Sequence, residues 1–409
     1  MLHIILFAIL LYFPIVVKAQ KAIVIVPVAE LVGQPMKTFY PHSNPETRYS
    51  KIPFCSGNTK TITCPRINQL LFNEQVDVLQ EKDEEVYIRI PNAFYVSHDD
   101  KKEHQEFWTL KKYIMPFDTL KKHEVAMQNF PGPITRAHNS MQTKQSIVTL
   151  KQPFFNRATG QHFSAGTRFV VCDSKKSSKV VSAYLFDPST YRFNVIRIPK
   201  QLCILNTPQD KNKCIELFVR ILHSWAHCKV PYVIPYVLGG CSFVDTYPAN
   251  QFSLKPAIGN SNTQANAYSY NAIPAAITSG FDCSGIILRA AHMAGIPYFC
   301  KNTSAIAANL QPLSAHDTLQ NGDLIWIPGH VMVVADTHKN TIIEARGYDH
   351  GYGKVHEIPI GEQFKGIKTF RNLIEVYNAK KPLMRLNKNG NVVKTIPNYK
   401  LFKLASVWG

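Results

Sequence analysis

The stretch from Gly280 to Gly285 constrains the fold more than any other part of the chain. It reads Gly-Phe-Asp-Cys-Ser-Gly, and apolar residues follow Cys283 at helical spacing until Gly295 provides a stop. The pattern therefore predicts a helix that begins at Cys283. At a helix start, unpaired backbone N–H groups and the positive end of the helix dipole stabilise a thiolate, so we expect a lowered thiol pKa and a nucleophilic cysteine. The alternative is a structural cysteine that only packs there.

A hairpin pattern further along the chain supplies groups that could work with this cysteine. Residues 324–346 alternate β-branched and aromatic segments with polar turns, which predicts antiparallel strands. In this hairpin His330 lies opposite Arg346 and shares its face with Glu344. His330 is therefore the candidate general base, and Glu344 is the candidate carboxylate that orients its ring. Because Cys283 and His330 are 47 residues apart (330 − 283), they can meet only through tertiary folding.

The segments upstream predict export and two β domains. Residues 1–19 resemble a secretion signal, and their apolar run of 14 residues is short for a membrane-spanning helix. Residues 20–115 show strand patterns without helical periodicity, and residues 116–145 read as a connector with one short helix. Strand signals return in residues 146–206. A helical pattern then marks a new domain over residues 207–378.

The composition limits the partners that we expect. Lys and Arg outnumber Asp and Glu by 46 to 28, and the formal charge of +18 favours anionic partners such as wall polymer or acidic lipid. The sequence has no zinc-finger spacing and no phosphate-binding glycine loop, so we expect no nucleic-acid partner. We see no Cys/His cluster with ligand spacing, so we expect no metal and no cofactor. The 9 cysteines suit an exported chain, with Cys55 and Cys64 as the most plausible local bridge.

Four short motifs follow one another in the C-terminal half of the chain. They are Pro-Tyr-Val-Leu-Gly-Gly at 235–240, Phe-Asp-Cys-Ser-Gly at 281–285, Gly-Asp-Leu-Ile at 322–325 and Gly-His-Val at 329–331. In this order they resemble the NlpC-type cell-wall cysteine peptidases, and the strand patterns upstream resemble bacterial SH3-like domains. The resemblance implies two all-β SH3-like barrels followed by an α+β papain-like catalytic domain, in which N-terminal helices pack on an antiparallel sheet.

The resemblance also implies an activity and roles for single residues. Family members cleave peptidoglycan stem peptides between D-γ-glutamate and the diamino acid through a cysteine thioester, in the periplasm or outside the cell. Cys283 and His330 match the nucleophile and the base. Tyr236, Asp282 and Ser284 match positions that line the substrate subsites, and Asp282 would hold the free amine of an N-terminal L-Ala.

The position of the third catalytic residue departs from the family pattern. The third catalytic residue is usually a histidine between Ile and Ala, whereas this chain has Glu344 there, so His350 and His356 are alternatives for the orienting role. Two other functions stay open, namely a wall-binding protein without activity and an acyltransferase that uses the same Cys/His pair. Residues 379–409 form a basic tail that could bind an anionic surface or add a strand pair near residues 392–393.

Overall fold

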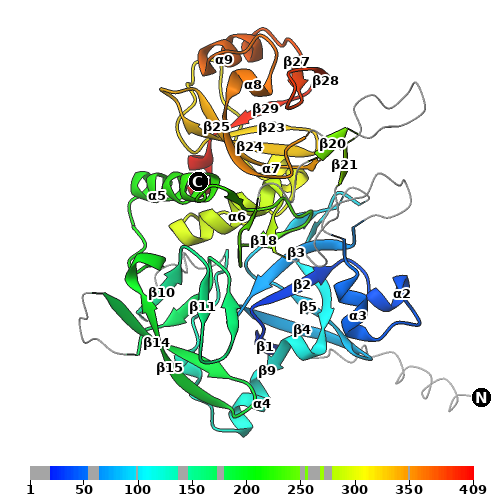
Figure 1. The fold of residues 1–409 in the computed structure, drawn as a ribbon, viewed down its shortest axis with the longest axis vertical. Helices are drawn as coiled ribbons and strands as arrows, with labels where there is room; N and C mark the ends of the chain where they lie inside the picture. Colours follow the sequence, from blue (N-terminus) through cyan, green and yellow to red (C-terminus); the bar gives the residue numbers. More distant parts are fainter. Residues whose placement is uncertain are drawn as a thin grey trace, which may run out of the picture.

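The computed structural model describes residues 19–53, 64–97, 100–136, 146–172, 179–248, 254–256, 268–270, 279–348 and 351–409. Residues 1–18 of the expected secretion signal, together with Cys55 and His350, lie outside these ranges. Two β-rich parts lie side by side at the bottom of Figure 1, and a third part with helices and a sheet lies above them. Among the described residues, no helix has the length and apolar character to cross a membrane.

The first part is a seven-stranded antiparallel sheet in the order β3-β2-β8-β5-β4-β1-β9. Its strands are β1 (Gln20–Val24), β2 (Val28–Val32), β3 (Arg66–Leu71), β4 (Gln75–Lys82), β5 (Glu85–Arg89), β8 (Glu106–Leu110) and β9 (Ile114–Pro116). Val76, Val78, Val86 and Ile88 are buried, as the alternating pattern predicts. No pairing between β3 and β9 closes this sheet within the described residues, so an SH3-like barrel stays a prediction.

The connections between these strands contain short elements that the sequence did not predict. Two helices, α2 (Met36–Phe39) and α3 (Pro45–Ser50), follow β2, and a small hairpin is formed by β6 (Tyr95–Val96) and β7 (Glu103–His104). The side chain of Asn44 caps α3 by accepting from the Thr47 N–H. Helices this short show no 3.6-residue periodicity, which explains why the pattern missed them.

The second part consists of three small antiparallel sheets. Their strands are β10 (Ile147–Leu150) with β13 (Arg168–Val170) and β16 (Cys203–Ile204), β11 (Phe154–Asn156) with β12 (Gln161–Phe163), and β14 (Val180–Asp187) with β15 (Arg192–Pro199). The connector before them holds the expected short helix, α4 (Phe117–Lys122). Ile23 and Phe72 of the first part belong to the same buried cluster as the second part's core. The two β-rich parts therefore pack as one unit.

The third part has a five-stranded antiparallel sheet with helices on both faces. Its strand order is β26 (Lys354–Pro359), β25 (Thr341–Arg346), β24 (His330–Asp336), β23 (Leu324–Ile327) and β29 (Lys400–Phe402). The helices α5 (Lys211–Ala226) and α6 (Cys283–Ala294) share one core with Val331 and Val333. On the opposite face, α8 (Ile360–Gln363) and α9 (Phe370–Asn378) pack with Met332 and Val334. Figure 1 shows α8 and α9 on the side of the sheet away from α5 and α6. A further helix, α7 (Thr303–Asn309), precedes the sheet.

Each of the two main helices begins at an aspartate cap. Asp210 accepts from the Lys213 N–H at the start of α5, and Asp282 accepts from two N–H groups at the start of α6. Gly295 ends α6 in the left-handed conformation, with φ of 80°, as the sequence predicts. Trp225 of α5 is fully buried and stacks on Phe281, just before α6, which fixes the two helices against each other.

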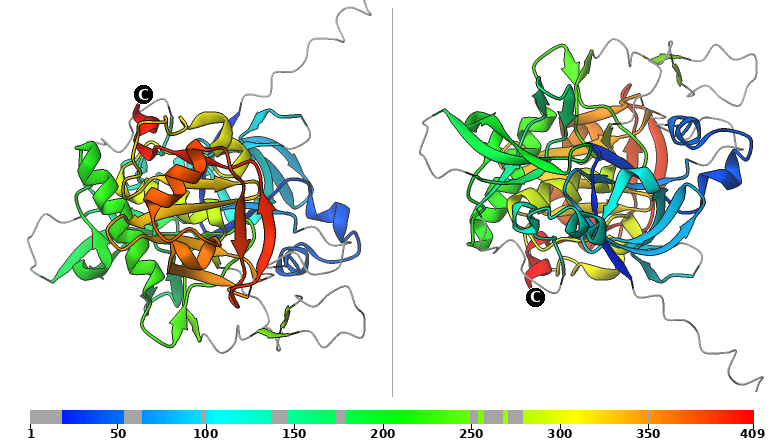
Figure 2. Two further views of the ribbon diagram at one scale, coloured as in Figure 1. Left: turned by 90° about the horizontal axis from the view of Figure 1, so that it is seen from above. Right: turned by 90° about the horizontal axis from the view of Figure 1, so that it is seen from below.

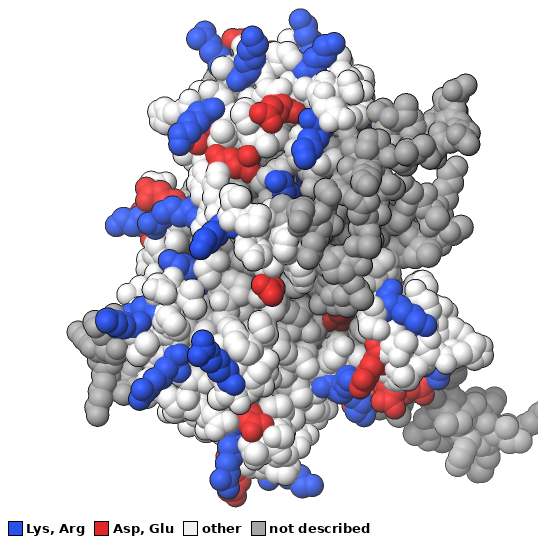
Figure 3. All heavy atoms as spheres, viewed as in Figure 1, with Lys and Arg blue, Asp and Glu red and all other residues white. Residues whose placement is uncertain are grey.

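The C-terminal segment is built into the third part. Residues of β29 pair with β23 at the edge of the sheet, and β27 (Leu383–Leu386) pairs with β28 (Val392–Ile396), so the expected strand pair near 392–393 is present. Figure 2 shows these red strands beside the yellow and orange ones of the sheet. Lys and Arg side chains lie scattered among acidic ones on the face drawn in Figure 3.

The glycines of the 235–240 motif allow the third part to contact the first. Gly239 has a φ of +74°, and a Cβ atom there would lie 2.4 Å from the Arg66 carbonyl oxygen. Arg66 itself donates to the Leu238 carbonyl oxygen (3.3 Å) and pairs with Glu30 (2.6 Å). A bulkier residue at Gly239 would separate the two parts at the start of the segment that leads to Cys283.

Candidate active site

Cys283 is the first residue of α6, as predicted. Asp282 precedes it in extended conformation, and its Oδ1 accepts from the Ser284 N–H (3.1 Å) and the Gly285 N–H (2.5 Å). A Cβ atom on Gly285 would lie 2.0 Å from the Gly240 carbonyl oxygen, so glycine is required where this helix start packs on the glycine pair. The segment before α6 is thereby held in a fixed position.

The thiol of Cys283 has a raised pKa, whereas the helix start alone predicted a lowered one. Cys283 is 7% exposed, and burial raises the pKa of its thiol to about 12, with a smaller contribution from the neighbouring charge of Asp282. A hydrogen bond from the Val331 N–H and the charges of Lys301 and Arg385 act in the opposite direction. Desolvation outweighs them, so the resting side chain is a neutral thiol.

His330 is the first residue of β24 and is 6% exposed. Because the Val331 N–H contacts the Cys283 sulfur, the thiol lies beside the peptide that joins His330 to Val331. The ring Nε2 of His330 lies 2.5 Å from Oε2 of Glu344. The imidazole that the sequence nominates as base is therefore held at the same end of the sheet as the thiol.

The protonation state of His330 follows from its surroundings. Burial and the charge of Arg385 lower the pKa of His330 to about 4, although Glu344 acts to raise it. The ring is therefore neutral at pH 7 and carries one proton. Because an ionised carboxylate can only accept hydrogen bonds, we assign this proton to Nε2, which leaves a lone pair on Nδ1.

Glu344 is a buried carboxylate at the centre of a polar network. Its Oε1 accepts from Nε2 of His356 (3.0 Å), the residue directly opposite on β26, and lies 3.6 Å from Arg346. Its Oε2 also lies 3.5 Å from the Gln363 amide and 4.0 Å from Arg385. Burial acts to raise the pKa of Glu344, but Arg346, His330 and His356 hold it well below its ordinary value. The carboxylate is therefore ionised.

The structure brings together the predicted pair of His330 and Glu344. Strand register pairs Val333 with Ile343 and Val334 with Ile342, and the same register continued places His330 opposite Arg346 as expected. His356, one of the alternatives, contacts Glu344 and not the base. Among the described residues, which do not include His350, Glu344 is the predicted candidate whose side chain contacts the His330 ring.

Two members of the network were not found from the sequence. Gln363 lies on α8 and also accepts a hydrogen bond from Arg346 (2.5 Å), while Arg385 lies on β27. Both come after the last recognisable motif, and a lone Gln or Arg in an amphipathic segment gives no pattern to detect. Only the shared face of Arg346 and Glu344 in the hairpin pattern pointed towards this network.

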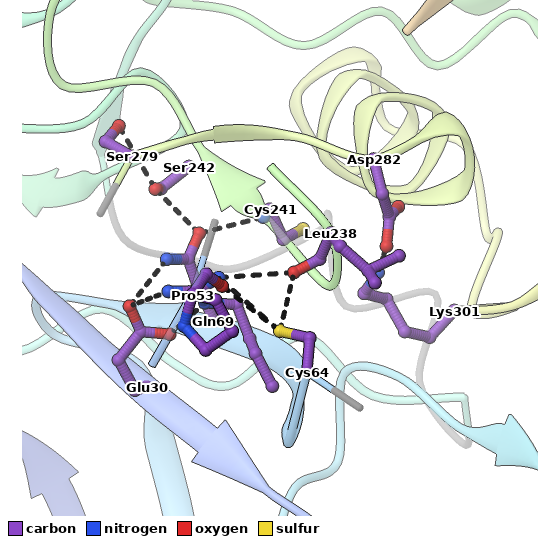
Figure 4. A network of polar contacts seen from close by, with 11 residues as sticks. Glu30, Pro53, Cys64, Gln69, Leu238, Cys241, Ser242, Ser279, Asp282 and Lys301 are labelled. Carbon is purple, nitrogen blue, oxygen red and sulfur yellow. Dashed lines mark hydrogen bonds and ion pairs between the residues drawn. The ribbon is translucent and has the colours of Figure 1, made fainter. Parts of the chain in front are cut away.

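The three predicted subsite residues surround the start of α6. Ser284 donates from Oγ to Oδ1 of Asp282 (2.9 Å). Oδ2 of Asp282 lies 2.7 Å from Nζ of Lys301, which is 2% exposed (Figure 4). Tyr236 lies edge-on to Tyr348, with ring centroids 6.2 Å apart, and its backbone bridges to Phe281. The carboxylate that the resemblance assigns to a substrate amine thus already contacts one ammonium group.

Comparisons with known proteins give structural similarities only. No protein-family model matches the chain, and no curated protein matches it. The structure is similar to that of a NlpC/P60 family protein from Bacillus cereus, with 14% identity, a TM-score of 0.48, and coverage of 83% of this chain and 94% of that chain. NlpC1 from Trichomonas vaginalis is similar over 83% and 88% of the chains, at 10% identity and a TM-score of 0.29. The peptidoglycan hydrolase RipB from Mycobacterium tuberculosis is similar over 47% and 65%, at 18% identity and a TM-score of 0.24.

Proposed function

We propose that this chain is an exported cysteine endopeptidase of peptidoglycan stem peptides. Its substrate bond is the amide between D-γ-glutamate and diaminopimelate, in peptides with a free N-terminal L-Ala. The observation that carries the proposal is the contact between His330 and the ionised Glu344, next to a cysteine at a helix start. The four sequence motifs, which resemble those of NlpC-type peptidases, supply the substrate class.

The proposed chemistry begins with a neutral thiol and a neutral imidazole. Nδ1 of His330 takes the thiol proton as the Cys283 sulfur attacks the γ-carbonyl carbon of D-glutamate, which forms an oxyanion. The Cys283 backbone N–H, at the helix start, is the proposed donor to this oxyanion. The C–N bond then breaks, the departing amine takes the proton from His330, and a thioester remains on the sulfur. Water hydrolyses the thioester by the same base, which releases the acid and restores the thiol.

Glu344 acts through His330 in this proposal. It holds the proton of the neutral ring on Nε2, so that the lone pair stays on Nδ1, and its charge stabilises the imidazolium that forms during the reaction. Arg346, His356 and Gln363 contact this carboxylate and fix its position. Glu344 is therefore a positioning residue that replaces the histidine usual in the family.

Asp282 is the proposed anchor for the substrate amine. Its Oδ1 accepts three hydrogen bonds from Ser284 and Gly285, and its Oδ2 accepts one from Lys301. A carboxylate oxygen has two lone pairs, so Oδ2 can accept from one more donor. We propose that the amine of L-Ala shares Oδ2 with Lys301.

The test is hydrolysis of L-Ala-γ-D-Glu-diaminopimelate by the chain without residues 1–19, with products identified by mass. We expect L-Ala-D-Glu and diaminopimelate from the intact protein, and no products from Cys283→Ala. Cys228→Ala is the matched control, because Cys228 is a half-buried thiol next to α5 that donates to the Trp225 carbonyl oxygen. It should cleave at the rate of the unmodified chain.

Other outcomes of this assay would overturn the proposal. Binding of peptidoglycan without cleavage would indicate a wall-binding protein, and amide products with an added amine would indicate an acyltransferase. Equal cleavage of an N-acetylated peptide would remove only the amine-binding role of Asp282.

A further inference from the structure

A second group of side chains with metal-binding chemistry lies outside the candidate active site. His223 is in the last turn of α5, and His227 is the residue that ends this helix, so the two imidazoles are four residues apart on one face. Glu357 faces them from β26. Nδ1 of His223 and Nε2 of His227 each lie 2.7 Å from Oε2 of Glu357, and the three donor atoms lie within 4.8 Å of one another.

We propose that His223, His227 and Glu357 form a binding site for a divalent transition-metal ion, best fitted by Zn²⁺. Imidazole nitrogens and one carboxylate oxygen are a ligand set that zinc takes, with a further position left for water. Tetrahedral bonds of about 2.0–2.2 Å separate donor atoms by about 3.3 Å. The two N–O separations of 2.7 Å would therefore open by about half an ångström when the ion enters between the three side chains.

The surroundings of the three side chains favour a cation. The carboxylate is oriented from its other oxygen, because Oγ1 of Thr341 donates to Oε1 of Glu357 (2.5 Å), which is the kind of support that metal ligands receive. The carbonyl end of the α5 helix dipole adds a partial negative charge. The side chain of Glu357 is 10% exposed and that of His227 is 64% exposed, so an ion can enter from solvent and meet a fixed carboxylate.

The site would join two elements of the third part. α5 supplies two ligands and β26 supplies the third, so a bound ion acts as a clamp between helix and sheet. Ser224 occupies the position after His223 where zinc peptidases with two helical histidines carry a glutamate base. We therefore assign the ion a role in holding α5 on the sheet and no role in hydrolysis. The spacing His-x-x-x-His was present in the sequence, but its third ligand is 130 residues further on, which is why the pattern was not recognised.

The test is calorimetric titration of Zn²⁺ into tag-free protein treated with a chelator, in a Cys283→Ala background that removes the candidate nucleophile as a competing ligand. We expect one equivalent to bind and to raise the unfolding temperature. His227→Ala, at an exposed helix end, and Glu357→Gln should each weaken binding by more than the 10- to 100-fold that loss of a supporting group causes, and Thr341→Val by about 10-fold. His338→Ala is the control, because His338 is an exposed histidine in the turn after β24.

Substitution by Co²⁺ gives a readout of the ligand atoms. A tetrahedral cobalt spectrum without thiolate charge transfer, lost in His227→Ala, supports the site. The proposal is overturned if binding is absent, if it is unchanged in His227→Ala, or if the cobalt spectrum shows a thiolate ligand. In the absence of metal binding, the three side chains are a hydrogen-bonded group only. None of these readouts depends on peptide cleavage.

Discussion

Two carboxylates on neighbouring strands each lie between two imidazoles, on opposite faces of the same sheet. Glu344 contacts His330 and His356 on the face covered by α8, and Glu357 contacts His223 and His227 on the face covered by α5. His356 and Glu357 are consecutive in β26, so the alternation of a strand sends them to opposite faces. The same combination of two imidazoles and one carboxylate therefore occurs twice, in two different environments.

Burial and neighbouring charges differ between the Glu344 group and the Glu357 group. The ring of His330 is 8% exposed and Glu344 is fully buried beside Arg346, whereas His227 is 64% exposed. In the first group the low pKa of Glu344 and the lowered pKa of His330 fix a neutral ring with a defined tautomer. In the second group solvent reaches the side chain of His227, which leaves a path for an ion. The comparison teaches that exposure is the feature that distinguishes the His–Glu–His group proposed as a fixed proton acceptor from the one proposed as a cation site.

Among the variants that test the difference between the two groups, Glu344→Gln should have the largest effect, a loss of turnover. The amide removes the charge that holds the His330 tautomer, and the equivalent change in a serine triad lowers kcat by about ten-thousand-fold. Steady-state cleavage of the stem peptide measures it, with circular dichroism to confirm folding. Glu357→Gln removes the carboxylate of the other group and should leave kcat within about twofold in metal-free buffer. Equal losses in both variants would contradict the distinction between the two groups.

Lys301→Met should strongly lower the free energy of unfolding. The substitution leaves the carboxylate of Asp282 without its ammonium partner in a buried position, and loss of one member of a buried pair costs about 3–5 kcal/mol. Urea unfolding measures the change. Lys339→Met is the control, because the Lys339–Asp336 pair is exposed on the lysine side and should contribute at most about 1 kcal/mol. A loss at Lys301 no larger than at Lys339 would show that Asp282 has other support.

One imidazole from each group sharpens the comparison further. His356→Gln disturbs a buried hydrogen bond to an ionised carboxylate and should cost about 1.5–3 kcal/mol of unfolding free energy. His227→Gln changes an exposed side chain and should stay within about 0.5 kcal/mol without metal. Chemical denaturation of both variants in chelator tests this difference. Similar losses of unfolding free energy in the two variants would show that burial does not distinguish the two groups.

The smallest expected effect is a shift in the pH profile. His330 acts as a base only when neutral, so kcat should fall as the pH drops through about 4 and not near 6.5. Because Glu344 acts to raise the pKa of His330, the residual activity of Glu344→Gln should fall at lower pH still. Between about pH 6.5 and 4 the unfolded chain binds a proton at this histidine that the folded chain does not bind, so its contribution to stability declines as pH falls. An acid limb near 6.5 would contradict the burial of His330.

The sequence predicted those parts of the fold and site that depend on local periodicity. Cys283 at a helix start, Gly295 at its end and the register of His330 and Glu344 follow from 3.6- and 2-residue repeats. The predicted direction of the pKa shift of the Cys283 thiol was wrong. Local helix effects are visible in the sequence, whereas desolvation arises from tertiary packing. Arg385 could not be assigned for the same reason, since it reaches the network from a strand beyond the recognisable motifs.

The most direct test of the proposed function is to trap the acyl group on the chain. Stem peptide is mixed with the protein, the reaction is stopped with acid during the first turnovers, and the digested protein is analysed by mass. We predict an L-Ala-γ-D-Glu adduct in thioester linkage on Cys283, which disappears with hydroxylamine and does not form in Cys283→Ala. An adduct on another cysteine would contradict Cys283 as the nucleophile. Cleavage of the peptide by the Cys283→Ala variant, with no adduct formed, would contradict it as well.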